Sequence, residues 1–254
     1  MVGREADRPA RAAVSHQHWE HVVFLHWPIP ARDLVPLLPP GLCPHTADGT
    51  AWLTVTPLRM HARPAFLPRL PYVSHFDEVN VRTYVIGPDG RDGVWFFSLE
   101  CPRSPVVVAL RAVGLRYVWS RTAVRVRAEY LAVTSERRDG RGRMQASIRV
   151  REREDLDPLA TFLTGRWSAY VRRFGHLLRI DIEHPPWPLY RADARADVAD
   201  LLRADGLPSV QDRPLAHYSP GVRARIGWPR PVGGPGEGGS SEWPATARHN
   251  GPHA

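Results

Sequence analysis

Four polar side chains alternate with valines and a threonine in the segment FDEVNVRTYVI at 76–86. A strand sends successive side chains to opposite faces, so Glu78, Asn80, Arg82 and Tyr84 would share one face at steps of about 7 Å. A carboxylate, an amide, a guanidinium and a phenol in one row could carry a proton, orient a ligand and bind its carboxylate. On a sheet open to water, the same row is only a polar face with a supporting ion pair. The chemistry therefore depends on whether the sheet closes around this face.

The chain contains no lysine, because all 34 of its Lys and Arg positions are arginine. An amine that forms a Schiff base near neutral pH must lose its proton, and a guanidinium does not. Imine chemistry through a lysine side chain, including lysine-anchored pyridoxal phosphate, is excluded, and only the N-terminal amine remains. Codon usage rich in G and C explains the absence, since arginine, alanine, proline and glycine are all abundant.

Other reaction classes lack their residues. The sequence has no phosphate-binding glycine loop and no dinucleotide fingerprint, and Ser98 lies outside a G-x-S-x-G elbow. Four early histidines do not share one strand face at metal-ligand spacing: His16, His18, His21 and His26. No metal and no cofactor are therefore predicted. We expect His26 to be a packed, hydrogen-bonded histidine and Trp187 to be a packing anchor between prolines.

The formal charge of +8 and the pI near 10.3 raise the possibility of a nucleic-acid partner. The arginines are scattered, however, and often alternate with apolar residues, as in RVR at 125–127, which is typical of the wet face of a strand. This distribution disfavours nucleic acid. An electrostatic partnership with nucleic acid or an acidic protein stays the weakest of the hypotheses below.

Cys43 and Cys101 form no C-x-x-C motif, so two reduced thiols are expected. The N-terminal segment lacks the apolar run of a signal peptide, and no stretch approaches the length of a membrane helix. These features predict a cytoplasmic protein without a membrane partner. The open edges of a curved sheet make a homodimer a reasonable hypothesis.

The strongest periodic signals are those of strands. Strands are predicted at 19–28, 51–60, 76–86, 94–100, 117–132, 143–151, 167–173, 177–183 and 220–227. Hairpin loops are predicted at 87–93 and 136–142, and short helices at 31–38, 104–113, 157–165 and 192–204. Residues 1–16 and 230–254 are expected to be disordered around a single domain at 17–229. The fold class is α+β, with a large antiparallel sheet that curls toward a barrel and a few peripheral helices.

Eight ordered blocks resemble the YqjF-like family known as DUF2071. They are HWPIPARDLVPLLPPGL (26–42), DGTAWLTVTPLRM (48–60), LPYVSHFDEVNVRTYV (70–85), GVWFFSLE (93–100), LRAVGLRYVWSRTAV (110–124), FLTGRWSAY (162–170), HPPWPLYRA (184–192) and HYSPGV (217–222). The resemblance covers about residues 19–229. This family is grouped with the acetoacetate decarboxylase-like superfamily, whose members have a cone-like β-barrel with an internal cavity. The resemblance thus implies that the row from Glu78 to Tyr84 faces a pocket.

The resemblance also adds two residues to the candidate site. By position, Arg111 and the segment 114–117 resemble the stretch that supplies the Schiff-base lysine in acetoacetate decarboxylase, which places Tyr117 near that lysine. A phenol forms no imine, so decarboxylation by that route is excluded. The expected catalytic residues are Glu78 and Tyr117, and the expected ligand-binding residues are Asn80, Arg82, Tyr84 and Arg111.

Three functions stay open at this point. The first is a lysine-independent lyase, hydratase or isomerase that acts on a small anionic or carbonyl-bearing metabolite by acid/base chemistry. The second is a module that binds such a metabolite without transforming it. The third is the electrostatic partnership with nucleic acid or an acidic protein, which requires affinity that falls steeply with salt.

Overall fold

The computed structural model describes residues 12–154, 157–210 and 213–232. Its strands are β1 (Ala13–Ile29), β2 (Cys43–Pro44), β3 (Ala51–Pro64), β4 (His75–Ile86), β5 (Asp92–Cys101), β6 (Tyr117–Arg127), β7 (Tyr130–Arg137), β8 (Arg143–Arg153), β9 (Ser168–Arg173), β10 (His176–Glu183), β11 (Tyr190–Asp197), β12 (Leu215–Gly227) and β13 (Arg230–Pro231). Its helices are α1 (Ala31–Leu34), the 3-10 turn η1 (Val35–Leu37), α2 (Ser104–Arg111), α3 (Pro158–Thr164) and α4 (Ala199–Ala204).

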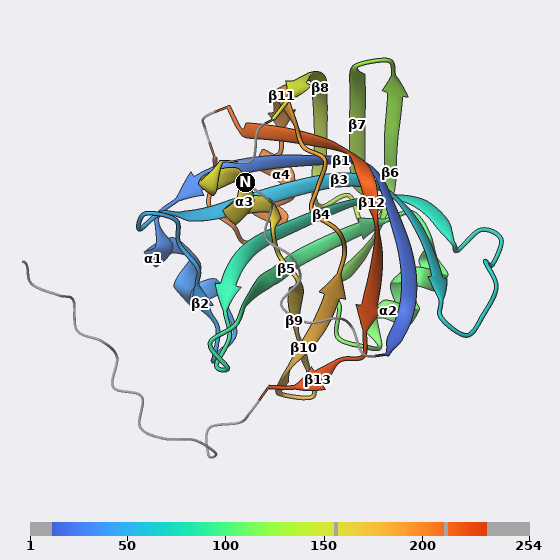
Figure 1. The fold of residues 1–254 in the computed structure, drawn as a ribbon, viewed down its shortest axis with the longest axis vertical. Coiled ribbons are helices and arrows are strands. Elements are labelled where there is room, and N and C mark those ends of the chain that lie inside the picture. The colour runs from blue at the N-terminus through green and yellow to red at the C-terminus, as the bar shows by residue number, and fades with distance from the viewer. Residues whose placement is uncertain (1–11, 155–156, 211–212, 233–254) are drawn as a thin grey trace, which may run out of the picture.

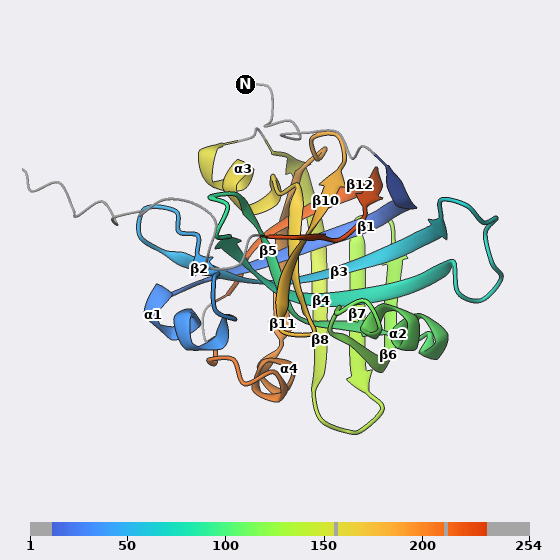
Figure 2. The same cartoon turned by 90° about the horizontal axis from the view of Figure 1, so that it is seen from below.

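All the strands join one sheet in the order β13-β10-β9-β5-β6-β7-β8-β11-β12-β1-β3-β4-β2 (Figure 1). Two further pairings, β4 with β5 and β10 with β12, close this sheet on itself. The narrow ring runs through β10, β9, β5, β4, β3, β1 and β12. The wide ring runs through β5, β6, β7, β8, β11, β12, β1, β3 and β4. Figures 1 and 2 show the panel of β6, β7 and β8 running steeply across the direction of β3 and β4.

The strands shared by both rings have an interior on each side. β4 illustrates the result, because Val79 and Val81 join the large aliphatic core of the wide ring while Glu78 and Asn80 face the narrow ring. Both polar side chains are buried, with exposed fractions of 2% and 5%. The alternation along this strand therefore separates two buried faces rather than a dry face and a wet one.

The predicted fold class is confirmed, with a dominant sheet and a few short helices. The hairpins predicted at 87–93 and 136–142 are present, since Val85 pairs with Gly93 and Glu136 pairs with Arg143 in antiparallel register. The sheet is antiparallel except where β5 pairs with β6 and with β9 in parallel.

Two predicted elements are wrong. The single strand predicted at 117–132 is a hairpin of β6 and β7. Its turn has Ala128 at a positive φ of 47°, without the Gly or Asn that usually marks such a turn. The helix predicted at 192–204 is β11 followed by α4. Its alanines suggested a helix, but pairing with β8 places Ala194 opposite Ile148, so tertiary contacts override the helix propensity.

The described strands extend beyond the expected domain at both ends. β1 begins at Ala13, inside the segment expected to be disordered, because Ser15 pairs with both Ile226 and Pro64. At the other end, β13 pairs with β10, and Val232 packs against the wide-ring core. The remaining parts of the two segments, 1–11 and 233–254, lie outside the described residues.

Candidate functional site

A cavity of about 130 Å³ lies inside the narrow ring. Four predicted site residues line it: Glu78, Asn80 and Arg82 from β4 and Tyr117 from the start of β6. Most of the remaining wall is apolar and includes Phe24, Leu58, Phe96, Leu99, Trp187 and Ile226. A few convergent polar groups on an apolar wall are typical of a small-molecule site.

Glu78 and Tyr117 form a buried acid pair in this cavity. The Tyr117 hydroxyl donates a hydrogen bond of 2.7 Å to Oε2 of Glu78. Burial raises the pKa of Glu78 to about 7, although hydrogen bonding by Tyr117 and Asn80 pulls it down, and burial also raises the pKa of Tyr117 well above 10. Near neutral pH, Glu78 can therefore accept or donate a proton while the phenol stays a donor.

Arg82 brings a guanidinium to the same cavity without a carboxylate partner among the described residues. Its Nε has no hydrogen-bond partner there, and its guanidinium carbon lies 5.4 Å from the centroid of the Phe24 ring. Burial lowers the pKa of Arg82, although interaction with Tyr84 acts in the opposite direction, and an arginine keeps its proton. Two cavity acceptors, Oδ1 of Asn80 and Oγ1 of Thr56, also lack partners within the described part of the chain.

Arg166, a second cavity arginine, was not predicted. It follows α3, pairs with Asp92, and lies 3.1 Å from Nδ1 of His45. Its guanidinium stacks 4.2 Å from the centroid of Phe162 and 4.8 Å from that of Tyr84. The sequence signal was its place in the apolar block FLTGRWSAY. Because Asp92 balances its charge, Arg166 differs from Arg82 in needing no added anion.

Two predicted ligand-binding residues lie outside the cavity. Tyr84 is fully buried where α3 covers the ring, and its hydroxyl donates to the carbonyl of Leu163 at 2.6 Å. Arg111 is exposed at the end of α2, and its Nε donates to the backbone carbonyl of Tyr117 at 2.6 Å. Tyr84 supports Arg166, and Arg111 holds the start of β6, so both are positioning residues.

Two residues considered as packing elements behave as expected. His26 is buried, with Nδ1 2.9 Å from Oγ1 of Thr54, and burial holds its pKa well below 6.5. Trp187 stacks on Trp19 with ring centroids 5.7 Å apart, and it also lines the cavity. Within the ranges that the structure describes, no three or more His, Cys, Asp or Glu side chains are arranged to hold a metal ion.

Comparison with solved structures identifies the fold. The enduracididine biosynthesis enzyme MppR, solved complexed with pyruvate, matches with a TM-score of 0.65 and 12% identity over 89% of this chain and 93% of MppR. An acetoacetate decarboxylase-like enzyme from Sphingomonas wittichii RW1 matches with a TM-score of 0.64 and 13% identity, over 89% of this chain and 96% of that one. At these identities the likeness shows the fold alone.

Comparison of sequences identifies the family. YqjF, an uncharacterized protein of Bacillus subtilis (strain 168), is 30% identical over 215 residues, which are 81% of this chain and 87% of YqjF. The model of the DUF2071 family of uncharacterized conserved proteins matches residues 16–223. This chain is therefore a member of the DUF2071 family with an acetoacetate decarboxylase-like fold.

Proposed function

We propose that this protein binds a small carboxylate- or carbonyl-bearing metabolite inside the narrow ring and moves a proton on it through Glu78. The observation that carries the proposal is Arg82, a guanidinium that lines the cavity and has no carboxylate partner among the described residues. Withdrawing a charge partly from water without a counter-charge is costly, and an anionic ligand would offset that cost. A ligand carboxylate on Arg82 would form charge-assisted hydrogen bonds with a planar donor group.

The size of the cavity limits the ligand. A buried water needs at least about 10–15 Å³, so a cavity of about 130 Å³ has room for several waters or for an organic acid of a few carbons. A coenzyme or a nucleotide would not fit. One structural neighbour, MppR, was solved complexed with pyruvate, and pyruvate is therefore one suitable probe.

The polar groups support acid/base chemistry. With a pKa of about 7, Glu78 can take a proton from a carbon next to a carbonyl and return it elsewhere on the ligand. Asn80 would orient the carbonyl, and Tyr117 would hold the carboxyl group of Glu78 in place. Since the chain has no lysine, the candidate reactions are hydration, dehydration, enolisation and lyase steps without a lysine imine.

Binding is tested by calorimetric titration of the protein with pyruvate and other short oxo and hydroxy acids. We expect saturable binding that Arg82→Met weakens by at least about a hundredfold, since a charge-assisted hydrogen-bond pair is lost. The matched control is Arg125→Met, which removes an exposed arginine of β6. Equal affinity in the Arg82 variant and the wild type would contradict the proposal.

Catalysis is tested separately with Glu78→Gln, which keeps the shape of the side chain and removes the proton carrier. Turnover should disappear in this variant while the affinity for the acid stays within a few-fold of wild type. Ligand binding by the wild type without any transformed product would instead assign the protein to the class of binding modules and reject the enzymatic part of the proposal.

A further inference from the structure

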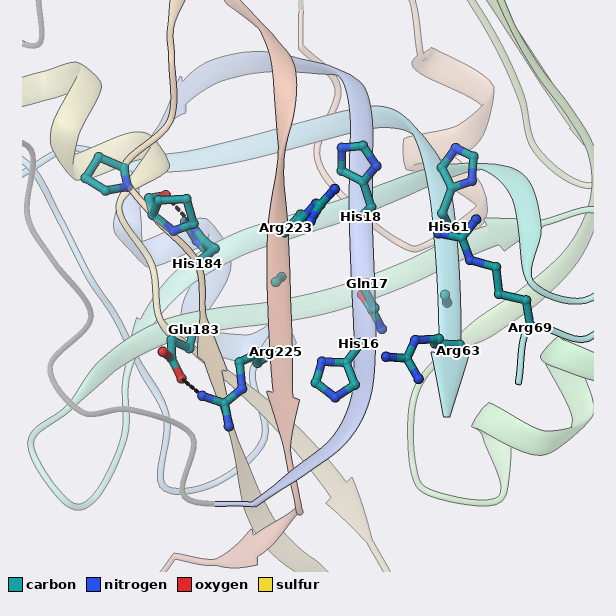
Figure 3. A pocket seen from close by; sticks show the side chains of 14 residues that line it. His16, Gln17, His18, His61, Arg63, Arg69, Glu183, His184, Arg223 and Arg225 are labelled. Carbon is teal, nitrogen blue, oxygen red and sulfur yellow. Dashed lines mark hydrogen bonds and ion pairs between the residues drawn. The ribbon is translucent and has the colours of Figure 1, made fainter. Parts of the chain in front are cut away.

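A second hollow, of about 860 Å³, lies on the outer face of β12, β1 and β3 (Figure 3). We call it the basic groove, because cross-strand pairing places cationic and titratable side chains there in two rows. One row is Arg225, His16 and Arg63, and the other is Arg223, His18 and His61. Arg69 lines the groove from the β3–β4 loop, and residues 183–186 line it from the end of β10 onward.

Acidic side chains balance only part of this groove. Glu183 pairs with Arg225 at 3.2 Å, and Glu20 contacts His18 and His61 at 3.2 and 2.9 Å. Three arginines form no ion pair within the described part of the chain, and all are exposed: Arg63, Arg69 and Arg223. Arginines gathered on adjacent strands repel one another, and an anionic surface would relieve that repulsion.

An apolar loop borders the basic groove. The β3–β4 loop, residues 65–74, projects away from the body of the protein (Figures 1 and 2). Four of its side chains are strongly exposed: Phe66 (78%), Leu67 (50%), Leu70 (40%) and Tyr72 (59%). The loop contains no acidic residue, and its own Arg69 lines the groove, so the apolar and basic surfaces are contiguous.

The loop is held at its base. The amide of Ala65 donates to the carbonyl of Val14 at 2.9 Å, and the amide of Leu70 donates to Oγ of Ser74 at 2.8 Å. The guanidinium of Arg103 lies 4.3 Å from the centroid of the Tyr72 ring. The apolar side chains are therefore presented by a fixed framework, and an exposed apolar patch of this kind marks an interaction surface.

We propose that this face docks on an anionic membrane surface. The apolar side chains of the β3–β4 loop would enter the boundary between headgroups and acyl chains, while Arg63, Arg69 and Arg223 bind lipid phosphates. A free phosphate compound would use the arginines and leave the apolar loop in water, so the two surfaces together favour a lipid layer. The contact is peripheral and needs no spanning helix. No helix among the described residues is long and apolar enough to cross a membrane. The contact uses none of the residues proposed to act in the cavity, although Gln17 and His184 line both hollows.

The proposal is tested by co-sedimentation of the full chain with phosphatidylcholine vesicles and with vesicles that also contain phosphatidylglycerol. Binding should require the anionic lipid. The double variant Phe66→Ser/Leu67→Ser should weaken it at least about tenfold, because apolar burial is lost. Phe174→Ser is the matched control, because Phe174 is 84% exposed in the β9–β10 turn, at the opposite end of β10 from Glu183. This substitution should change binding less than about twofold.

Charge is tested in the same assay. Arg63→Gln/Arg223→Gln should weaken binding at least about tenfold, whereas Arg125→Gln/Arg127→Gln, with the same net charge, should change it less than about threefold. Equal losses in both pairs, or no binding to anionic vesicles, would overturn the proposal. Normal vesicle binding by the loop variant would also overturn the proposal, because the arginines would then form a site for a free anion. Conversion of a dimer into a monomer by the loop variant would overturn it too, because the loop would then contact a second copy of the chain. Unchanged thermal unfolding of all four variants ensures that the losses are local.

Discussion

The narrow and wide rings share β5, β4, β3, β1 and β12, yet they enclose different interiors. The wide ring is filled by an aliphatic core that includes Val81, Val133 and Ile148. The narrow ring keeps a cavity with a row of polar groups on the other face of the same β4 strand. One strand thus contributes to stability through its odd-numbered residues and to the candidate site through its even-numbered residues.

Two arginines, the buried Arg137 and the half-buried Arg82, differ in the same way as the two interiors. Arg137 lies in the wide ring, where its guanidinium donates to Glu100 at 2.7 Å and to Asp205 at 2.6 Å. Arg82 lies in the narrow ring without a carboxylate partner among the described residues. We infer that Arg137 is part of the folded framework and that Arg82 is reserved for a ligand.

The largest expected effect is the difference between these two arginines. Arg137→Met should lower the free energy of unfolding by about 3–5 kcal/mol, because Glu100 and Asp205 would lose their counter-charge. Arg82→Met should leave it unchanged or raise it, since a partly buried charge without a counter-charge is removed. Urea unfolding of both variants measures the difference, and equal losses would show that Arg82 also has a structural anion partner.

The next effect is a pH dependence that comes from Glu78. Its pKa is about 7 in the folded protein and near the ordinary 4.5 when unfolded, so between these values the folded state holds a proton that the unfolded state has lost. The free energy of unfolding should therefore fall by about 3 kcal/mol as the pH rises from 4.5 to 7.

The control is Glu78→Gln, in which this contribution is absent. As the pH rises across that window, the free energy of unfolding of the variant should increase relative to that of the wild type. A difference that stays constant with pH would mean that Glu78 titrates normally and is not held in a dry site.

The smallest expected effect is that of Tyr117→Phe. The hydrogen bond from Tyr117 lowers the pKa of Glu78, so its loss should move the midpoint of the Glu78 titration above about 7. The accompanying loss of stability should be about 1 kcal/mol at pH 8, where the carboxylate needs its donor. Carboxyl infrared bands or the pH-dependent unfolding above can follow the midpoint, and a downward movement would reverse the assigned role.

Strand alternation was enough to predict that Glu78, Asn80 and Arg82 share a face, because the period of two is a local property. That the face is enclosed came only from the family resemblance, since ring closure depends on β4–β5 and β10–β12 pairings between distant segments. Tyr84 keeps the alternation but is covered by α3, and Arg111 points to the backbone of Tyr117. Their positions, like that of Arg166, depend on tertiary packing that no local pattern encodes.

We propose above that Arg82 is the anion-binding group of the cavity inside the narrow ring. A crystal structure of the protein with a bound short-chain oxo acid tests it most directly. We expect the ligand carboxylate within hydrogen-bond distance of the Arg82 guanidinium and its carbonyl beside Asn80. An acid bound elsewhere, with a protein carboxylate or a side chain filling the space beside Arg82, would contradict the account.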